Sequence, residues 1–130
     1  MYRRFLVAVI FAVLAACGGT VTNPSQNTIE NFNGTVDPAV NGGLGPLITF
    51  TAASNGEVDI VFTALSPAAL AIVNFGQFTQ NSCLPIAQQV GSVGQAVFAS
   101  SINQGTYCLV VQVYPGITVP FTYTLKVSHP

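Results

Sequence analysis

Charged side chains are scarce in this chain, and their scarcity excludes several functions. Only 5% of its 130 residues are Asp, Glu, Lys or Arg, against about 25% in an average soluble protein. Two of the three basic residues, Arg3 and Arg4, stand at the extreme N-terminus, which leaves Lys126 as the only other one. Without a basic patch, the chain is not expected to bind nucleic acid or to associate electrostatically with anionic lipid. The polar residues are mostly Thr, Ser, Asn and Gln, as in many exported β proteins.

Catalytic and metal-binding side chains are equally few. The only histidine, His129, precedes the last residue. A frayed terminus is predicted there, and a catalytic base needs a rigid site. Glu57 and Asp59 would lie about 7 Å apart on one strand face, which suits a glycosidase pair, but a solvated edge that discourages aggregation is favoured. Asp37, Glu57 and Asp59 do not share a loop dense in calcium ligands. We therefore expect no catalytic residue, no metal and no cofactor.

The chain also lacks an apolar run long enough to span a membrane. Its longest run, residues 5–16, has 12 residues, whereas a spanning helix needs about 20. Because this run follows two arginines and ends in small residues, it is typical of a secretory signal. A buried core helix is the alternative.

The end of this run, Leu14-Ala15-Ala16-Cys17, resembles the lipobox of bacterial lipoprotein signal peptides. The resemblance implies cleavage before Cys17, a diacylglycerol on its sulfur and an acyl chain such as palmitate on its new amine. Two or more acyl chains give stable membrane anchoring. Gly18 follows the cysteine in place of Asp, which in the enteric sorting pattern implies the outer membrane. The expected organisation is a signal peptide over residues 1–16, a lipidated tether over 17–28 and one domain over 29–130.

Cysteine is limited to three residues. With Cys17 assigned to lipid, Cys83 and Cys108 remain, and two cysteines in an exported domain favour one disulfide. Its loop of 26 residues, counted inclusively from Cys83 to Cys108, would contribute about 3–4 kcal/mol in the chain-entropy treatment. Two free buried cysteines are the alternative.

Beyond residue 28, short runs with a period of two predict strands and no helix. The predicted strands are 29–36, 47–52, 57–65, 69–75, 83–90, 95–102, 106–114 and 121–127. Ser54-Asn55-Gly56 reads as a tight turn, so strands 47–52 and 57–65 are predicted to form a hairpin. Pro85 limits its segment to a sheet edge. These elements predict an all-β fold, a single antiparallel β-sandwich of seven or eight strands, with an up-and-down barrel as the alternative.

Residues 76–82 are predicted to form a loop, with one aromatic residue directly before the loop and one within it. Phe75 and Phe78 stand on either side of Gly76-Gln77. Aromatics in a loop could stack on a sugar or dock a partner, or they could cap the core. They are the only candidate binding residues of the domain.

Five segments resemble the bacterial pre-peptidase C-terminal domain, a jelly-roll-like β-sandwich of exported proteins. They are Phe32-Asn33-Gly34-Thr35-Val36-Asp37, Ile48-Thr49-Phe50-Thr51-Ala52, Gly56-Glu57-Val58-Asp59-Ile60, Gly105-Thr106-Tyr107-Cys108-Leu109-Val110-Val111 and Phe121-Thr122-Tyr123-Thr124-Leu125-Lys126-Val127. The resemblance implies this fold and no catalysis. The acidic residues that family members carry in their middle strands are absent around residues 69–75, so no calcium site is expected.

The function expected from the sequence is therefore that of a lipid-anchored, non-catalytic binding or structural module of the bacterial envelope. Its partners would be the membrane, through Cys17, and an envelope protein or a glycan. A carbohydrate-binding module using Phe75 and Phe78 is the first alternative. A small hydrolase using Glu57 and Asp59 is the second.

Overall fold

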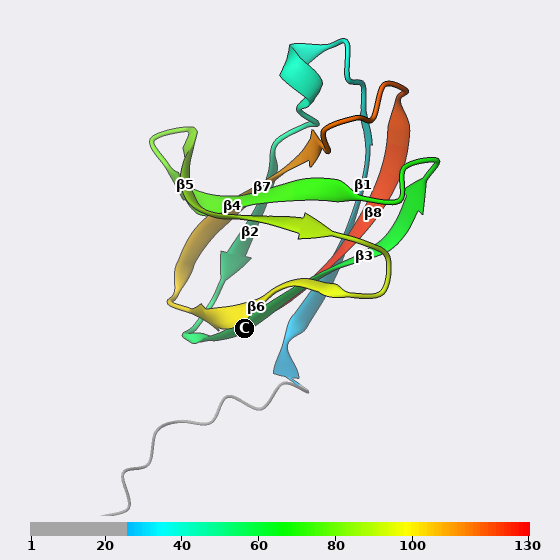
Figure 1. Ribbon diagram of the computed structural model, residues 1–130. Coiled ribbons are helices and arrows are strands. Elements are labelled where there is room, and N and C mark those ends of the chain that lie inside the picture. The colour runs from blue at the N-terminus through cyan, green and yellow to red at the C-terminus, as the bar shows by residue number, and fades with distance from the viewer. Residues whose placement is uncertain (1–25) are drawn as a thin grey trace, which may run out of the picture.

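The computed structural model describes residues 26–130, and these form eight strands and one short 3₁₀ turn. No helix in this part of the chain has the length and apolarity to cross a membrane. In chain order the elements are β1 (Thr28–Val36), η2 (Asn41–Gly43), β2 (Ile48–Ala52), β3 (Gly56–Ser66), β4 (Ala71–Thr79), β5 (Ser82–Gly91), β6 (Ala96–Ile102), β7 (Gly105–Val113) and β8 (Phe121–His129) (Figure 1).

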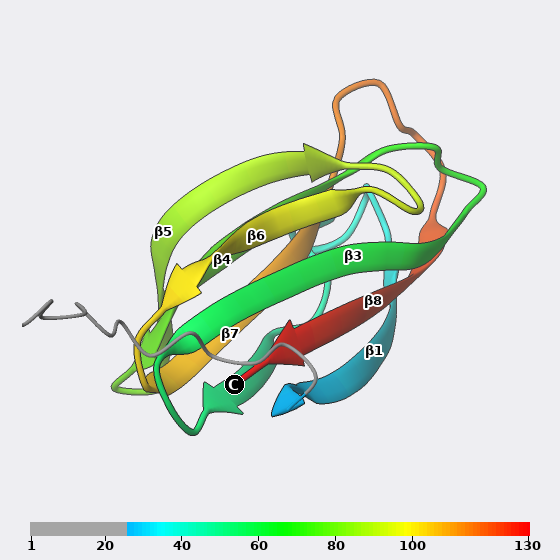
Figure 2. The ribbon, with the colours of Figure 1, turned by 90° about the horizontal axis from the view of Figure 1, so that it is seen from below.

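The strands form two antiparallel four-stranded sheets, so the sandwich prediction is confirmed. Sheet A has the order β1-β8-β3-β6 and sheet B the order β2-β7-β4-β5. Figure 2 shows the strands of sheet A side by side, with sheet B behind them. The pairs β1–β8, β2–β7, β3–β6 and β4–β5 nest inside one another, as in a long hairpin rolled up on itself. This is the jelly-roll arrangement, which handles sheet edges without closing a barrel.

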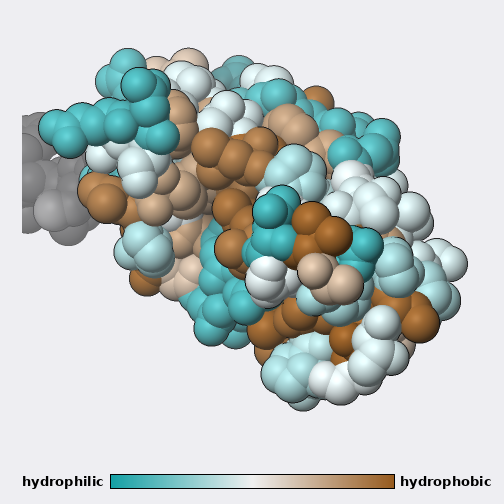
Figure 3. All heavy atoms as spheres, turned by 90° about the horizontal axis from the view of Figure 1, so that it is seen from above, coloured by the Kyte–Doolittle hydropathy of each residue, from teal (hydrophilic) through white to brown (hydrophobic). Residues whose placement is uncertain are grey.

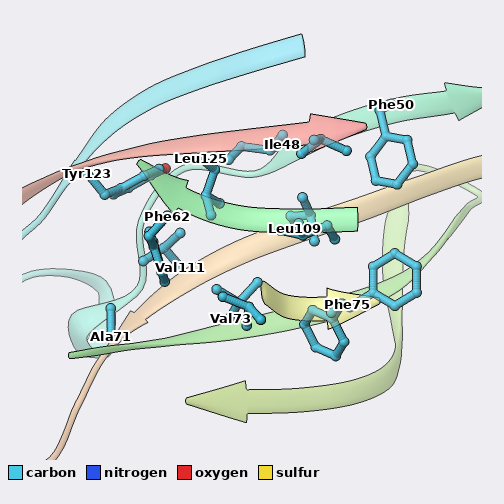
Figure 4. Packing of buried hydrophobic residues seen from close by; sticks show 14 of the residues in the cluster. Ile48, Phe50, Phe62, Ala71, Val73, Phe75, Leu109, Val111, Tyr123 and Leu125 are labelled. Carbon is cyan, nitrogen blue, oxygen red and sulfur yellow. The ribbon is translucent and has the colours of Figure 1, made fainter. Parts of the chain in front are cut away.

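Alternating apolar residues explain why most strands have one buried face, whereas the edge strand β5 is largely exposed. In β8, Phe121, Tyr123, Leu125 and Val127 are buried while the residues between them are not. Both sheets contribute to a single core, and Figure 4 shows Phe50 and Phe75 at one end of it and Tyr123 at the other. The rings of Phe75 and Tyr107 stack with centroids 5.4 Å apart.

The predicted hairpin between β2 and β3 is wrong, because the two strands belong to different sheets. Strand β2 pairs only with β7, and β3 pairs with β6 and β8. The connection between them crosses from one sheet to the other. It is held at its ends by long-range bonds: Ala53 N donates to Pro130 O at 2.9 Å, and Gln104 N donates to the Asn55 side-chain oxygen at 2.8 Å. A turn motif indicates a reversal of the chain but does not indicate which strand lies beside it.

The predicted loop over residues 76–82 is also wrong. Strand β4 continues to Thr79, and a turn at Gln80 and Asn81 leads directly into β5. Both turn residues have positive φ, 49° and 60°, as the two-residue hairpin turns of twisted sheets require. The edge prediction for the segment with Pro85 is confirmed, since β5 is the last strand of sheet B.

Candidate functional site

The predicted disulfide is present and lies on the outer face of sheet B. Cys83 in β5 bonds Cys108 in β7, with 5.8 Å between their Cα atoms. These strands flank β4, and the bond passes over Gly76 of that strand, which pairs with Cys108. A Cβ at Gly76 would collide with the Leu84 carbonyl and lie 2.9 Å from the Cys83 sulfur. The glycine therefore makes room for the bridge between the two neighbouring strands.

Sheet B carries no charged residue in any of its four strands. Among residues 26–130, the Asp, Glu, Lys and His side chains stand on β1, β3 and β8 of sheet A or, for Asp37, in the loop after β1. Asp37 accepts a hydrogen bond from Ala39 N at 2.9 Å. The outer face of sheet B is consequently an uncharged surface of aliphatic, amide and, on β2 and β7, threonine side chains.

Three amides form a network across the middle of this face. Asn74 of β4 lies directly opposite Gln88 of β5, and Gln112 of β7 lies opposite Ile72, two residues from Asn74 on the same face. The Gln88 side-chain nitrogen donates to the Asn74 oxygen at 2.8 Å, and the Asn74 nitrogen donates to the Gln112 oxygen at 3.1 Å. The Asn74 nitrogen also lies 3.4 Å from Val110 O. Because each amide is held by its neighbour, the three side chains are positioned before any ligand arrives.

A groove of about 360 Å³ opens over two of these amides, Asn74 and Gln112. Its polar lining is Asn74 and Gln112, and its other lining residues are Gly42, Leu44, Phe75, Cys83, Pro85 and Val110. Leu44 reaches it because the segment after η2 runs beside β7 and forms a bridge with Gln112. Viewed from the side of sheet B, brown apolar residues gather across the middle of the surface, with hydrophilic ones between and around them (Figure 3). The volume is within the range of small-ligand sites, about 300–1,000 Å³.

The two aromatics predicted from sequence do not form an exposed pair. Phe75 is only 4% exposed, and its ring stacks in the core on Tyr107 and Phe50. Phe78 is half-buried on β4, opposite Cys83. The predicted loop is a strand, and alternation along a strand turns Phe75 into the core. A ring in that place caps one end of the core and is not presented to a sugar.

The carboxylates Glu57 and Asp59 lie on the outer face of β3, as alternation predicts. They line a separate hollow of about 350 Å³ together with Asn27, Ala99 and Ser128. The expected sheet edge is wrong, because β3 lies between β8 and β6. Within residues 26–130 no group of three or more His, Cys, Asp or Glu side chains could hold a metal ion.

The predicted frayed terminus at His129 is wrong. This residue ends β8, is 3% exposed and packs its ring 5.0 Å from that of Phe50. Its Nε2 atom lies 2.8 Å from the Glu30 carboxylate. The pairing of Thr28 with His129 between β1 and β8 orders the end of the chain. His129 therefore closes one end of the core.

Tyr123 is the other buried polar side chain with a distinctive environment. It is 2% exposed and lies opposite Gly34, so that its ring covers the space that a side chain at Gly34 would fill. Its hydroxyl has no hydrogen-bond partner among the described residues. Burial raises the pKa of the Tyr123 phenol above its ordinary value of 10.0. Aromatic covering of a strand glycine accounts for this arrangement.

The predicted lipidation site, Cys17, and the signal segment, residues 1–16, lie outside the described residues. The amide network was missed, although Asn74, Gln88 and Gln112 each interrupt an apolar strand. That interruption is a readable signal, but only the order of the strands shows that the three positions converge.

Comparison with known proteins identifies no relative. The chain matches no protein-family model, and a search of curated proteins finds no significant match. The likeness to the pre-peptidase C-terminal domain therefore stays a prediction. Assignment of function depends on the geometry described above.

Proposed function

We propose that this chain is a lipid-anchored protein of the bacterial envelope whose β-sandwich is a non-catalytic binding module. The observation that carries the proposal is the outer face of sheet B. There an uncharged groove and a fixed set of amides lie beside a disulfide. Polar side chains that are held in position at a concave apolar surface are typical of binding sites. The disulfide supports export, because such bonds persist in oxidising compartments.

The position of the groove supports display away from a membrane. Thr28 pairs with His129, so the start and the end of the described chain lie together at one end of the sandwich. The segment with η2 follows the opposite end of β1, and its Gly42 and Leu44 line the groove. A lipid on Cys17 would hold the first of these ends at the membrane. The side of the groove formed by Gly42 and Leu44 would then face away from the membrane.

The anchor is tested by expressing the full chain in a Gram-negative bacterium and measuring the mass of the membrane-extracted protein. We expect loss of residues 1–16 and added acyl mass on Cys17. The variant Cys17→Ala should lose the acyl mass and leave the membrane fraction. An intact N-terminus on the extracted protein would contradict the anchor.

The non-catalytic assignment has its own test. The purified chain should show no turnover in a broad screen of glycoside, ester and peptide substrates. The strongest contrary result would be hydrolysis that is lost in both Glu57→Ala and Asp59→Ala, because these carboxylates line the hollow on sheet A. Hydrolysis that survived both changes would point to an impurity or to other residues.

A further inference from the structure

We propose that the groove on sheet B binds an uncharged glycan, read by the amide of Gln112 in its lining and by the amide of Gln88, which lies beside it and is bonded to Asn74. This inference rests on the proposed function of a binding module and names its ligand class. The residues concerned come from three neighbouring strands, β4, β5 and β7, which the jelly-roll topology brings together.

The hydrogen-bonding capacity of the amides is only partly used. Asn74 is engaged at both its nitrogen and its oxygen, by Gln112, Val110 and Gln88. These contacts leave the Gln112 nitrogen and the Gln88 oxygen outside the network. A primary amide nitrogen has two hydrogens to donate, and an amide oxygen accepts. The network therefore leaves one donor group and one acceptor group without a partner among residues 26–130, both on the outer face of sheet B.

A hydroxyl both donates and accepts, so adjacent sugar hydroxyls complement this pair. The aliphatic surfaces of Leu44, Pro85 and Val110 offer contact to the C–H faces of a sugar ring. Sheet B carries no charged side chain, so a phosphate, sulfate or carboxylate would find no ionic partner in its strands. These features favour a neutral glycan over an acidic one.

A peptide is less well matched to this surface. An extended peptide is usually bound along an open strand edge, where its backbone completes the ladder. Strands β4 and β7, which carry Asn74 and Gln112, are each paired on both sides, so no backbone edge is open beneath these two amides in the groove. Strand β5, which carries Gln88, is the edge strand beside it. Recognition here must use side chains, and the available ones suit hydroxyls.

The test measures binding of the full chain, purified in a detergent without a sugar headgroup, to two matched panels. One contains neutral hexose and N-acetylhexosamine oligosaccharides, and the other contains uronic-acid oligosaccharides of equal length. We expect binding in the neutral panel. Each of Gln88→Ala and Gln112→Ala should weaken it about fivefold, the effect of one neutral hydrogen bond.

Gln89→Ala is the matched control. Gln89 is exposed and adjacent to Gln88, but it pairs with Val73 and so belongs to the other face of β5. Its removal should leave glycan affinity unchanged. All three variants should retain the Cys83–Cys108 disulfide and the unfolding midpoint of the parent chain.

The remaining outcomes separate this inference from the proposed function. Equal or tighter binding of uronic-acid chains, or neutral binding indifferent to both glutamine changes, would overturn the glycan groove. Absence of glycan binding with specific retention of an envelope protein would also overturn it, while leaving a binding module. A chain that retained nothing from solubilised envelope and bound no glycan would overturn both.

Discussion

The outer faces of the two sheets differ sharply, although their inner faces are alike. Both outer faces present hydroxyl side chains, but sheet A also carries Glu57, Asp59 and Lys126, whereas sheet B carries aliphatic side chains, three linked amides and no charge. Both inner faces contribute to the same apolar core. Burial of the core therefore does not require the outer faces to differ. Under the proposed function, sheet B is the face that carries the contacts made by the domain.

The sheets also differ in what covers a closely packed strand glycine, Gly34 in sheet A and Gly76 in sheet B. In sheet A, Gly34 lies under the ring of Tyr123, a side chain that can move. In sheet B, Gly76 lies under the Leu84 backbone and the Cys83 sulfur, which the disulfide holds. Sheet B is thus the more constrained of the two. The predictions below start from this constraint.

Removal of the disulfide should have the largest effect on stability. The variant carrying both Cys83→Ala and Cys108→Ala should lose about 3–4 kcal/mol of unfolding free energy, because the closed loop no longer restricts the unfolded chain. Urea unfolding of the variant and parent chains measures the difference. A loss below about 1 kcal/mol would mean that the bridge does not constrain sheet B.

Gly76→Ala should cost about 2–3 kcal/mol, since backbone and a bridged sulfur cannot yield to the added methyl. Gly34→Ala should cost less, because the Tyr123 ring can rotate away from its collision. The same urea titration compares the two variants. If Gly34→Ala proved the more costly, sheet A would be the more constrained sheet.

Tyr123→Phe should raise the unfolding free energy by about 1 kcal/mol, because it removes a buried hydroxyl that lacks a partner among the described residues. The pH dependence has a definite sign. Burial raises the pKa of this phenol in the folded chain, so its contribution to stability is full below the unfolded pKa of about 10 and is lost as the pH rises through the folded value. The parent chain should therefore lose more stability than Tyr123→Phe above pH about 10. Equal alkaline slopes would contradict this.

Changes on the outer face of sheet A should have the smallest effect. Thr124 donates to the Asn33 side-chain oxygen at 2.7 Å, but the pair is exposed. Thr124→Val should change the unfolding free energy by no more than about 0.5 kcal/mol and leave glycan binding unaltered. Loss of binding in this variant would transfer the site to sheet A.

The sequence was sufficient to predict the class of fold, because alternation in β3 and β8 shows which side chains are buried. It was also sufficient for the pairing of Cys83 with Cys108, since Cys17 was assigned elsewhere. It was not sufficient to identify the strand partners of β2 and β3. The predicted hairpin between them is wrong because a local turn carries no information about distant strand partners.

The candidate site was predicted less well for the same reason. Phe75 and Phe78 were placed in a loop, because the positive φ of Gln80 and Asn81 marks a turn that residue type alone signals weakly. The groove depends on Leu44, Asn74 and Gln112, which are distant in sequence. Only the order of strands in sheet B brings them together.

Residue-resolved amide hydrogen exchange would test the central claim most directly. Exchange is measured on the full chain with and without the neutral oligosaccharide that binds most tightly in the panel. We predict that the ligand slows exchange on sheet B, at amides near Asn74, Val110 and Gln112, and leaves β1, β3 and β8 unchanged. Slowed exchange confined to sheet A, or no change in either sheet, would contradict the claim that sheet B is the binding face.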